Sequence, residues 1–190
     1  MIGDGQNARE HLKVIKAMDG VVAEVITSRT ISKAEELAEI YAVEKVCENI
    51  GDLKKCGLDA VMILVSIDQI YDVAVQIIPT SIPLFLEKPP GLIPDQTKNL
   101  LDLAEKHGTK NMVGYNRRYY SIFHNGMKMI NNHGKLLGLT VEGHERFWEI
   151  SIRDIPNEIR EGWIFGNSTH TFDLLRFFGG EIESINTLSK

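Results

Sequence analysis

The stretch Gly3-Asp4-Gly5-Gln6-Asn7-Ala8 decides the fold of this chain, because it fits the pattern G-x-G-x-x-A. The first glycine permits a tight turn from a strand into a helix, the second lets the backbone approach a pyrophosphate, and the small third residue lets helix and strand pack closely. The pattern is a weak signal alone, but an amphipathic segment with Leu12 and Ile15 follows it here, and then a strand-like segment. It predicts a dinucleotide site, with a chance glycine turn as the alternative. The predicted cofactor-binding residues of the turn are Gly3, Gly5, Gln6, Asn7 and Ala8.

Strand-like and helix-like segments alternate from this turn to about residue 114. Strands are predicted over residues 22–26, 43–46, 58–65, 82–86 and 111–113, and helices over residues 32–41, 69–78 and 95–107. The run 58–65 is almost wholly apolar, which is typical of a strand buried on both faces. Ser32, with Glu35 three residues later, predicts a capping box. The alternation predicts an α/β fold, a Rossmann-type doubly wound parallel sheet with helices on both faces.

The pattern changes after about residue 120. A helix is predicted over residues 121–132, a strand over residues 138–148 from its alternation of apolar and polar side chains, and a helix over residues 167–178 that ends at Gly179-Gly180. Glu183-Ser184-Ile185 indicates the start of a further strand. We therefore predict a nucleotide-binding domain over residues 1–119 and the beginning of an α+β domain over residues 120–190.

The residues after the second strand predict which dinucleotide is bound. This position normally carries an Asp or Glu that binds the adenosine ribose, but here the chain reads Thr27-Ser28-Arg29. Ser28 is able to donate a hydrogen bond to a 2′-phosphate, and Arg29 is able to form charge-assisted bonds with it and to stack on adenine. We therefore expect NADP(H) in preference to NAD(H). The alternative is that Arg29 is a solvated turn residue.

Glu87-Lys88-Pro89 closes the apolar strand 82–86. Pro89 cannot continue a sheet ladder, so the strand ends there and holds Lys88 at its tip. Open α/β sheets bind their ligands at the carboxyl ends of the strands, which makes Lys88 a candidate site residue. A surface charge pair followed by a turn is the alternative for this tripeptide alone.

The composition is that of an ordinary globular protein, with 190 residues, 43% hydrophobic, 25% charged and a net charge of −5. No Lys/Arg-rich stripe with interleaved aromatic residues is present, which disfavours nucleic-acid binding. No apolar run approaches the ~20 residues that span a bilayer, and no basic segment followed by an apolar core opens the chain, so we expect neither a membrane partner nor a signal peptide. Cys47 and Cys56 lack companions at metal-ligand spacing, so we expect no metal, free thiols and a cytoplasmic location.

Together these motifs resemble the Gfo/Idh/MocA oxidoreductases, a family named for glucose-fructose oxidoreductase and inositol dehydrogenase. Two further stretches are similar to that family: residues 113–119, Val-Gly-Tyr-Asn-Arg-Arg-Tyr, and residues 170–180, His-Thr-Phe-Asp-Leu-Leu-Arg-Phe-Phe-Gly-Gly. The resemblance implies a nicotinamide enzyme that acts on a sugar, a polyol or a nucleotide sugar. It implies Lys88 as the acid/base group, with His170 assisting. It also implies that the second domain contains a mostly antiparallel sheet, which walls the substrate pocket and joins homo-oligomers.

The implied chemistry is consistent with these residue types. Hydride transfer to or from a carbinol carbon requires a proton to leave or join the oxygen. A desolvated lysine beside the positive nicotinamide has a lowered pKa and exchanges that proton near neutrality, and a histidine relays it. Glu87 is expected to position Lys88 or to contact the cofactor, Asn116 to reach the nicotinamide or substrate, and Asp173 to orient His170 or a sugar hydroxyl. The alternatives are a packed helix-start histidine for His170 and a solvated helix residue for Asp173.

The chain departs from the family pattern at several positions. Many members carry an Asp four residues before the helix histidine, where this chain has Gly166, followed by Asn167 as the expected helix N-cap. The loop after the fourth strand, often Thr-Pro in the family, is the segment 65–71 here. The missing Asp leaves open a non-catalytic dinucleotide-binding sensor or assembly partner of the same fold, and an unrelated Rossmann reductase is a third reading.

The ends of the chain also differ from the family pattern. Only Met1 and Ile2 precede the glycine turn, so we expect the first strand to be incomplete and its neighbours to lack backbone partners. At the other end the chain stops at Lys190, soon after a new strand is predicted to begin. We therefore expect a partial sequence that is poorly stable and inactive by itself.

Overall fold

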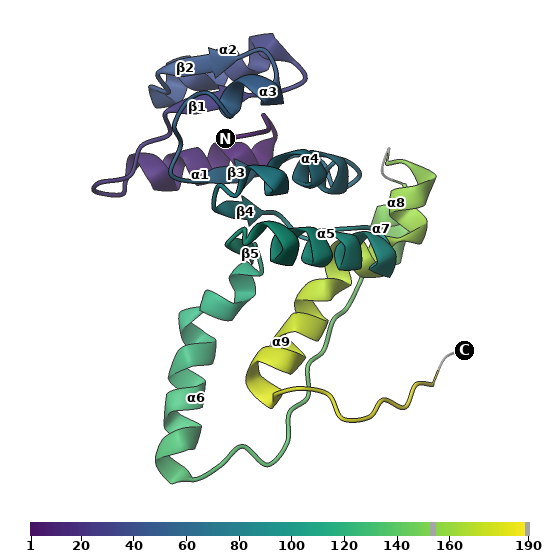
Figure 1. Cartoon of the computed structure of the whole chain (residues 1–190). Helices are drawn as coiled ribbons and strands as arrows, with labels where there is room; N and C mark the ends of the chain where they lie inside the picture. The colour runs from purple at the N-terminus through teal and green to yellow at the C-terminus, as the bar shows by residue number, and fades with distance from the viewer. Residues whose placement is uncertain (153–154, 189–190) are drawn as a thin grey trace. The chain divides into compact units, whose positions relative to one another are not determined.

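The computed structural model describes residues 1–152 and 155–188 of the chain. The chain divides into two units, Met1–Gly114 and Tyr115–Lys190. The first unit runs from purple to teal in Figure 1, and the second is drawn in green and yellow.

The first unit alternates helices and strands. Its elements are α1 (Gln6–Lys16), β1 (Val25–Thr27), α2 (Ile31–Tyr41), β2 (Lys45–Cys47), α3 (Ile50–Leu53), β3 (Val61–Ile63), α4 (Ile70–Ile77), the 3₁₀ turn η1 (Ile78–Thr80), β4 (Leu84–Leu86), α5 (Pro94–His107) and β5 (Asn111–Val113). All strands and helices predicted in this part of the chain are present, although most of the strands are shorter than predicted. The short helix α3 was not predicted.

All strand pairs in this unit are parallel, as the alternation predicts. β1 pairs with β2, and β4 lies between β3 and β5. Ile2 joins the two groups, because it forms parallel bridges with Thr27 of β1 and with Ile63 of β3. The order across the sheet is therefore β2-β1-Ile2-β3-β4-β5, which is a doubly wound arrangement.

The expectation that the short first strand leaves its neighbours without backbone partners is wrong. The Ile2 N–H donates to the Met62 carbonyl at 2.8 Å, and the Ile2 carbonyl accepts from the Leu64 N–H at 2.8 Å. The Gly3 N–H donates to the Thr27 carbonyl at 2.9 Å. A parallel strand spaces its bonds evenly, so two or three residues are enough to satisfy the facing edges of strands as short as β1 and β3.

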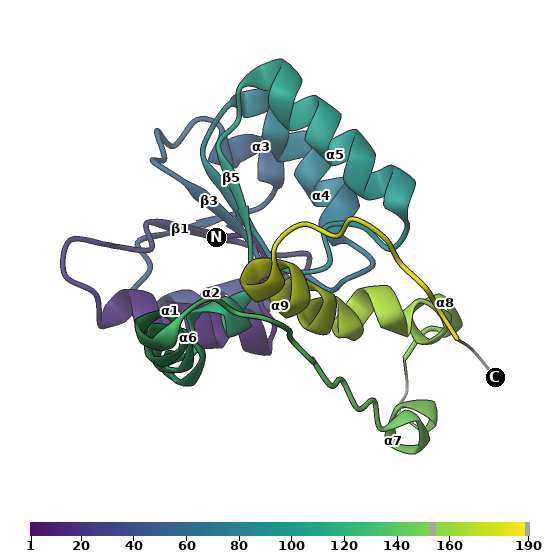
Figure 2. The same ribbon diagram turned by 90° about the horizontal axis from the view of Figure 1, so that it is seen from below.

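Helices cover both faces of this sheet (Figure 2), with α1 and α2 on one face and α3, α4 and α5 on the other. Successive strand residues point to opposite faces, and the core divides accordingly. Val25 packs in the cluster that contains α4 and α5, whereas its neighbour Ile26 packs in the cluster that contains α1 and α2. This double burial explains why the central strands β1, β3 and β4 are mostly apolar.

The start of α2 differs from the prediction. The helix begins at Ile31 with Thr30 at the N-cap, and the cap makes no side-chain hydrogen bond, so the predicted capping box at Ser32 is wrong. The Thr30 N–H instead donates to the Ser28 hydroxyl at 2.9 Å, so Ser28, which lies outside the helix, holds the turn that leads into α2. The end of α5 agrees with the prediction, because Gly108 closes it in the left-handed region with φ 63°.

The regular elements of the second unit are all helical over the residues that the structure describes. Its elements are the 3₁₀ turn η2 (Asn116–Tyr119), α6 (Ser121–His133), α7 (Phe147–Ser151), α8 (Asn157–Glu161), the π-helical turn η3 (Ile164–Ser168) and α9 (Thr169–Gly179). The strands predicted over residues 138–148 and from residue 183 are not present. An alternating segment becomes a strand only where another strand pairs with it, and none of the described residues of this unit forms one.

Candidate functional site

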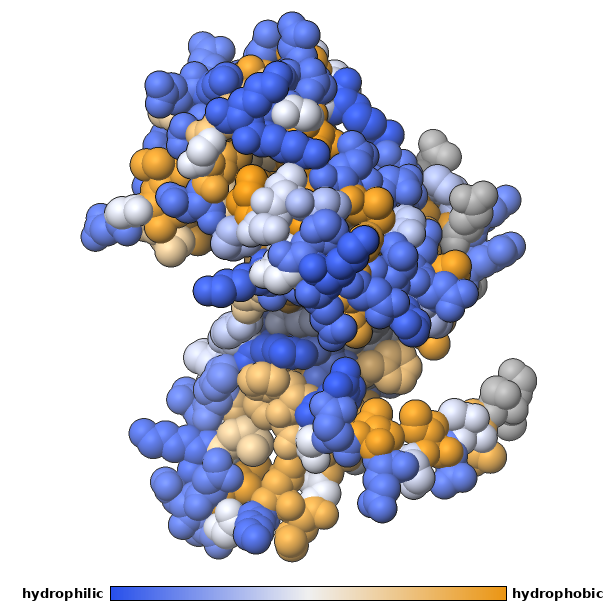
Figure 3. Space-filling model, viewed as in Figure 1, coloured by the Kyte–Doolittle hydropathy of each residue, from blue (hydrophilic) through white to orange (hydrophobic). Residues whose placement is uncertain are grey.

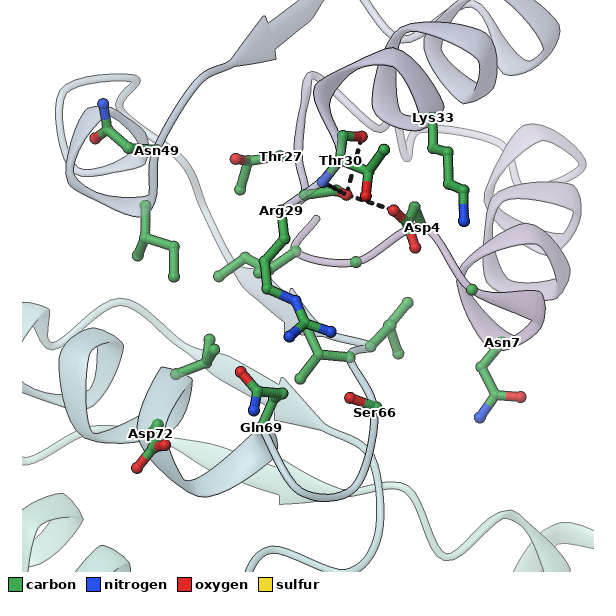
Figure 4. A pocket seen from close by; sticks show the side chains of 18 of the residues that line it. Asp4, Asn7, Thr27, Arg29, Thr30, Lys33, Asn49, Ser66, Gln69 and Asp72 are labelled. Atoms are coloured by element: carbon green, nitrogen blue, oxygen red, sulfur yellow. Dashed lines mark hydrogen bonds between the residues drawn. The ribbon is translucent and has the colours of Figure 1, made fainter. Parts of the chain in front are cut away.

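A pocket of about 940 Å³ lies at the carboxyl ends of β1 and β3 (Figure 4), where parallel sheets bind their ligands. The glycine turn, the start of α2, the segment after β2 and the loop after β3 all contribute to its wall. Of the predicted cofactor-binding residues, those that line it are Gly3, Gly5, Gln6, Asn7, Ser28 and Arg29. Two of the predicted residues lie elsewhere: Ala8 is fully buried in the core beneath the turn, and Glu87 is not part of this wall.

The two glycines of the turn are required for different reasons. Gly3 has φ +125°, and a Cβ added there would lie 2.3 Å from the Leu64 carbonyl oxygen. A Cβ added at Gly5 would meet nothing within 4 Å, because it faces the open pocket. Gly3 is therefore required by the packing of the turn on β3, whereas Gly5 leaves room for a ligand.

The amino end of α1 supplies anion-binding groups to this pocket. Gly5 is the N-cap, and no side chain caps the N–H groups of the first turn. Gln6 and Asn7, the first residues of the helix, line the pocket wall. Uncapped N–H groups and the positive end of the helix dipole favour a phosphate, so the geometry fits the pyrophosphate of a dinucleotide.

Ser28, the residue after β1, differs from the prediction because its hydroxyl is already hydrogen-bonded within the protein. The Ser28 hydroxyl donates to the Asp4 carboxylate at 2.5 Å and accepts from the Thr30 N–H at 2.9 Å. A carboxylate thus lies beside the end of β1, although Ser28, Arg29 and Thr30, which follow β1, include none. Asp4 was missed because it belongs to the variable position of the glycine pattern, to which the pattern assigns no role.

Two cations line the same part of the pocket, Arg29 after β1 and Lys33 in the first turn of α2. Figure 4 shows the Arg29 guanidinium pointing toward Ser66 and Gln69 of the loop after β3. Burial raises the pKa of Asp68 in that loop, but hydrogen bonds from Ser66 and Gln69, with a smaller contribution from the Arg29 charge, lower it overall. Arg29 therefore faces the pocket interior.

Glu87 and Lys88 follow directly after β4, as predicted, and both are half-buried. The Glu87 carboxylate accepts the Lys88 backbone N–H at 3.3 Å, and its other oxygen lies 3.4 Å from Nε2 of His11. The His11 ring also meets Phe85 edge-to-face, with centroids 5.2 Å apart. His11 was missed, although it lies one helical turn after Asn7 on α1 and so shares a face with that pocket residue.

In the second unit, His170 and Asp173 lie on α9 and are both buried, at 7% and 8% exposed. Arg118 of η2 donates from two guanidinium nitrogens to the two carboxylate oxygens of Asp173, one of these bonds being 2.7 Å long. The same guanidinium stacks over Phe177, 4.9 Å from its centroid. The alternative that Asp173 is a solvated helix residue is therefore wrong. Both of its carboxylate oxygens accept from Arg118, a contact that was not predicted from the sequence.

The Tyr115 ring meets His170 edge-to-face, with centroids 6.0 Å apart. Burial raises the pKa of the Tyr115 hydroxyl, and the charge of Asp173 adds to this effect. Asn116, by contrast, is exposed at the start of η2, in the same turn as Arg118. The ion pair between Arg118 and Asp173 thus joins the turn that carries Asn116 to the helix that carries His170.

Gly166, at the position where the resemblance leads us to expect an Asp, lies in the π-helical turn η3 and is buried. Asn167 is not the helix N-cap that was predicted, because α9 begins at Thr169 with Ser168 before it. Both Asn167 and Ser168 instead donate to Glu145, at 3.0 and 2.8 Å. Burial raises the pKa of Glu145, but these bonds and one from Trp163 outweigh it and lower the pKa.

Among the residues that the structure describes, no group of three or more His, Cys, Asp or Glu side chains is arranged to hold a metal ion. In residues 1–152 and 155–188, none of the helices has the length and apolar character needed to cross a membrane.

Comparisons with known proteins agree with this geometry. A family model described as an oxidoreductase family with an NAD-binding Rossmann fold matches residues 1–115. The myo-inositol dehydrogenase Hyg17 of Streptomyces leeuwenhoekii is 24% identical over 152 residues, which are 78% of this chain and 46% of that protein. The inositol 2-dehydrogenase of Rhizobium meliloti (strain 1021) is 26% identical over 188 residues, which are 95% of this chain and 54% of that protein.

Solved structures show the same fold. The crystal structure of myo-inositol 2-dehydrogenase from Lactobacillus plantarum superposes with a TM-score of 0.78 at 22% identity, over 93% of this chain and 54% of that one. This chain spans about half the length of the curated relatives that it matches.

Proposed function

Because the chain belongs to the Gfo/Idh/MocA oxidoreductases, we propose that it is the cofactor-binding part of an NADP(H)-dependent oxidoreductase that acts on a CH–OH group. The observation that carries the proposal is the pocket at the carboxyl ends of β1 and β3. Its wall combines a glycine open to the pocket with the uncapped start of α1, which together suit a pyrophosphate. The family match over residues 1–115 supports the same ligand.

Arg29 and Lys33 support NADP(H) as the preferred cofactor. Both line the pocket beside the end of β1, where a dinucleotide places its adenosine ribose. Guanidinium and ammonium groups favour a 2′-phosphate, which NADP(H) carries and NAD(H) lacks. NAD(H) remains the second cofactor of the proposal, since a carboxylate, Asp4, also lies at this end.

For the chemistry we assign Lys88 as the acid/base group, with His170 assisting. The nicotinamide, when bound, supplies hydride transfer to or from the substrate carbon. The Lys88 side chain would accept the proton of the substrate oxygen as a neutral amine when the alcohol is oxidised, and donate it as an ammonium when the carbonyl is reduced. Glu87 positions Lys88 by accepting its backbone N–H. Asn116 contacts the substrate or nicotinamide. Asp173 acts through Arg118, since this pair holds the turn of Asn116 against α9.

The proposed substrate is a sugar, a polyol or a nucleotide sugar. Two matched relatives are named inositol dehydrogenases, which supports a polyol first. We propose a cytoplasmic protein that forms homo-oligomers through its second domain and binds no nucleic acid.

A non-catalytic dinucleotide-binding sensor or partner is the second candidate. The observation that favours it is Gly166, which leaves α9 without the acidic residue that many family members carry before the histidine. In that case the pocket would bind a dinucleotide, but no substrate would be oxidised or reduced.

The deciding experiment compares the full protein with its Lys88→Met variant. We expect the full protein to turn over NADP⁺ with myo-inositol or another member of a polyol and sugar panel, and Lys88→Met to lose turnover while its Kd for NADPH is unchanged. Lys106→Met, an exposed lysine near the end of α5, is the matched control and should keep full turnover. Cofactor binding without turnover of any panel member by the unmodified protein would favour the sensor instead.

A further inference from the structure

We propose that Asp4 sets the ratio in which this protein binds NADPH and NADH, because its carboxylate takes the Ser28 hydroxyl that a 2′-phosphate would otherwise use. The inference rests on the proposed function, since it concerns the same dinucleotide pocket. It adds a specificity-determining residue at a position to which the glycine pattern assigns no role.

The only proton of the Ser28 hydroxyl already has an acceptor in this structure. A serine hydroxyl has one proton to donate. Ser28 Oγ lies 2.5 Å from the Asp4 carboxylate and 3.2 Å from the Thr30 carbonyl, while it accepts the Thr30 N–H at 2.9 Å. The shorter bond goes to the charged acceptor, which is the stronger one. The Ser28 proton is therefore already used, and a 2′-phosphate gains it only if the bond to Asp4 breaks.

The Asp4 carboxylate lies at the end of the pocket near β1. Asp4 belongs to the glycine turn, is half-buried and lines the pocket. In this fold a carboxylate near the end of the second strand accepts the ribose 2′-hydroxyl of NAD(H). Here the residues after β1 are Ser28 and Arg29, so the acceptor comes from the glycine turn instead. A carboxylate in this place favours a ribose hydroxyl and repels a phosphate dianion.

Two neighbouring cations oppose the effect of Asp4. Arg29 and Lys33 line the same end of the pocket and favour the 2′-phosphate. In Figure 4, Asp4 lies beside Thr30, and Lys33 extends toward the same side of the pocket. This end of the pocket therefore holds groups that suit each cofactor, and Asp4 limits the preference for NADPH that the two cations create.

Two other carboxylates line the pocket, Glu48 after β2 and Asp72 on α4. Neither bonds to Ser28, whose hydroxyl bonds only to Asp4 and Thr30 among the described residues. Asp72 lies away from Asp4 in Figure 4. It therefore provides a matched control, because Asp72→Asn removes the same charge from the same pocket without touching Ser28.

The test measures the Kd of NADPH and of NADH by fluorescence titration of the full protein and its variants. Asp4→Asn keeps the size of the side chain and should move the Kd ratio toward NADPH by about tenfold, mainly through tighter NADPH binding. Arg29→Ala should move the ratio the other way. Asp72→Asn should change it by less than about twofold. Should Asp4→Asn fail to fold, Asp4→Ala tests the same direction.

The possible outcomes separate this inference from the proposed function. An unchanged ratio in Asp4→Asn, with both nucleotides still bound, would overturn the role of Asp4 and leave the dinucleotide site standing. Equal shifts in Asp4→Asn and Asp72→Asn would also overturn it, because they would reflect the total charge of the pocket. If the unmodified protein bound neither nucleotide, the proposed function would fail, and this inference with it.

Discussion

The two units of the chain differ in how they cover their apolar side chains. In the first unit, helices on both faces of the sheet enclose two clusters of buried residues. In the second unit, the helices α6 and α9 expose large apolar side chains, which include Ile122, Met129, Phe172 and Phe177. Figure 3 shows orange side chains gathered between α6 and α9 on the visible face of this unit.

The contrast indicates where the folding free energy of each unit comes from. The first unit is stabilised mainly by apolar burial, which favours regular strands and helices. Among its described residues, the second unit buries few apolar side chains and joins its turns and helices through polar contacts, chiefly the Arg118–Asp173 pair and the bonds to Glu145. Substitutions should therefore act through different contacts in the two units.

The largest effect is expected from a core substitution in the first unit. Ile63 of β3 is fully buried, and Ile63→Ala should lower the free energy of unfolding by about 2–5 kcal/mol, through lost burial and a remaining cavity. Ile122→Ala, the same change at a 72% exposed position of α6, should cost less than about 0.5 kcal/mol. Urea denaturation of both variants measures the difference. A similar cost at both positions would show that another surface covers α6 in solution.

The two glycines of the turn should separate stability from binding. Gly3→Ala should lower the free energy of unfolding by more than about 2 kcal/mol, because φ is +125° and the added Cβ meets the Leu64 carbonyl. Gly5→Ala should leave the unfolding curve nearly unchanged and weaken NADPH binding by about tenfold or more, since the methyl group occupies space left for the pyrophosphate. Unchanged NADPH affinity in Gly5→Ala would place the cofactor elsewhere.

In the second unit, the ion pair of Arg118 should matter more than a surface pair of the same kind. Arg118→Ala leaves the buried Asp173 carboxylate without its arginine and should lower the free energy of unfolding by about 1–3 kcal/mol. Arg176→Ala breaks an exposed pair with Glu181 and should cost less than about 0.5 kcal/mol. Urea curves that respond equally to the two substitutions would contradict the structural role of Asp173.

The smallest effect is a pH dependence that arises from Glu145. Its pKa is lowered from the ordinary 4.5, because bonds from Trp163, Ser168 and Asn167 outweigh burial. A carboxyl with a depressed folded pKa contributes stability above its unfolded pKa, and this is lost as the pH falls through the folded value. The second unit should therefore weaken as the pH falls below 4.5, and Glu145→Gln should remove this part of the dependence. Unfolding curves between pH 6 and pH 3 measure it; identical slopes for both proteins would exclude the role of Glu145.

The fold of the first unit could be predicted because its signals are local. Apolar runs such as residues 58–65 are long enough to mark buried strands, and Gly108 ends its helix by its own backbone preference. The segment 138–148 carries a different local signal, an alternation of apolar and polar residues, but strand formation also depends on a partner strand, which a local pattern cannot supply. The Ser32 capping box failed because Ser28 fixes the turn from outside the helix.

The candidate site could be predicted in its types of residue but not in their pairings. The glycine turn, Ser28 and Arg29 do meet at one pocket, since strand ends gather at one edge of a parallel sheet. The hydrogen-bond partners of the predicted site residues lie far away in the sequence: Asp4 is the partner of Ser28, His11 of Glu87 and Arg118 of Asp173. No local pattern specifies such contacts, and they decide which side chains keep a hydrogen bond for a ligand.

Whether the first unit binds a dinucleotide at its glycine turn is best decided by hydrogen–deuterium exchange with and without NADPH. At saturating NADPH, exchange should slow most in residues 3–7 and 28–30, which line the pocket, while α6 should change little. Unchanged exchange at residues 3–7, or protection that appears only in α6, would mean that the dinucleotide does not bind at the glycine turn.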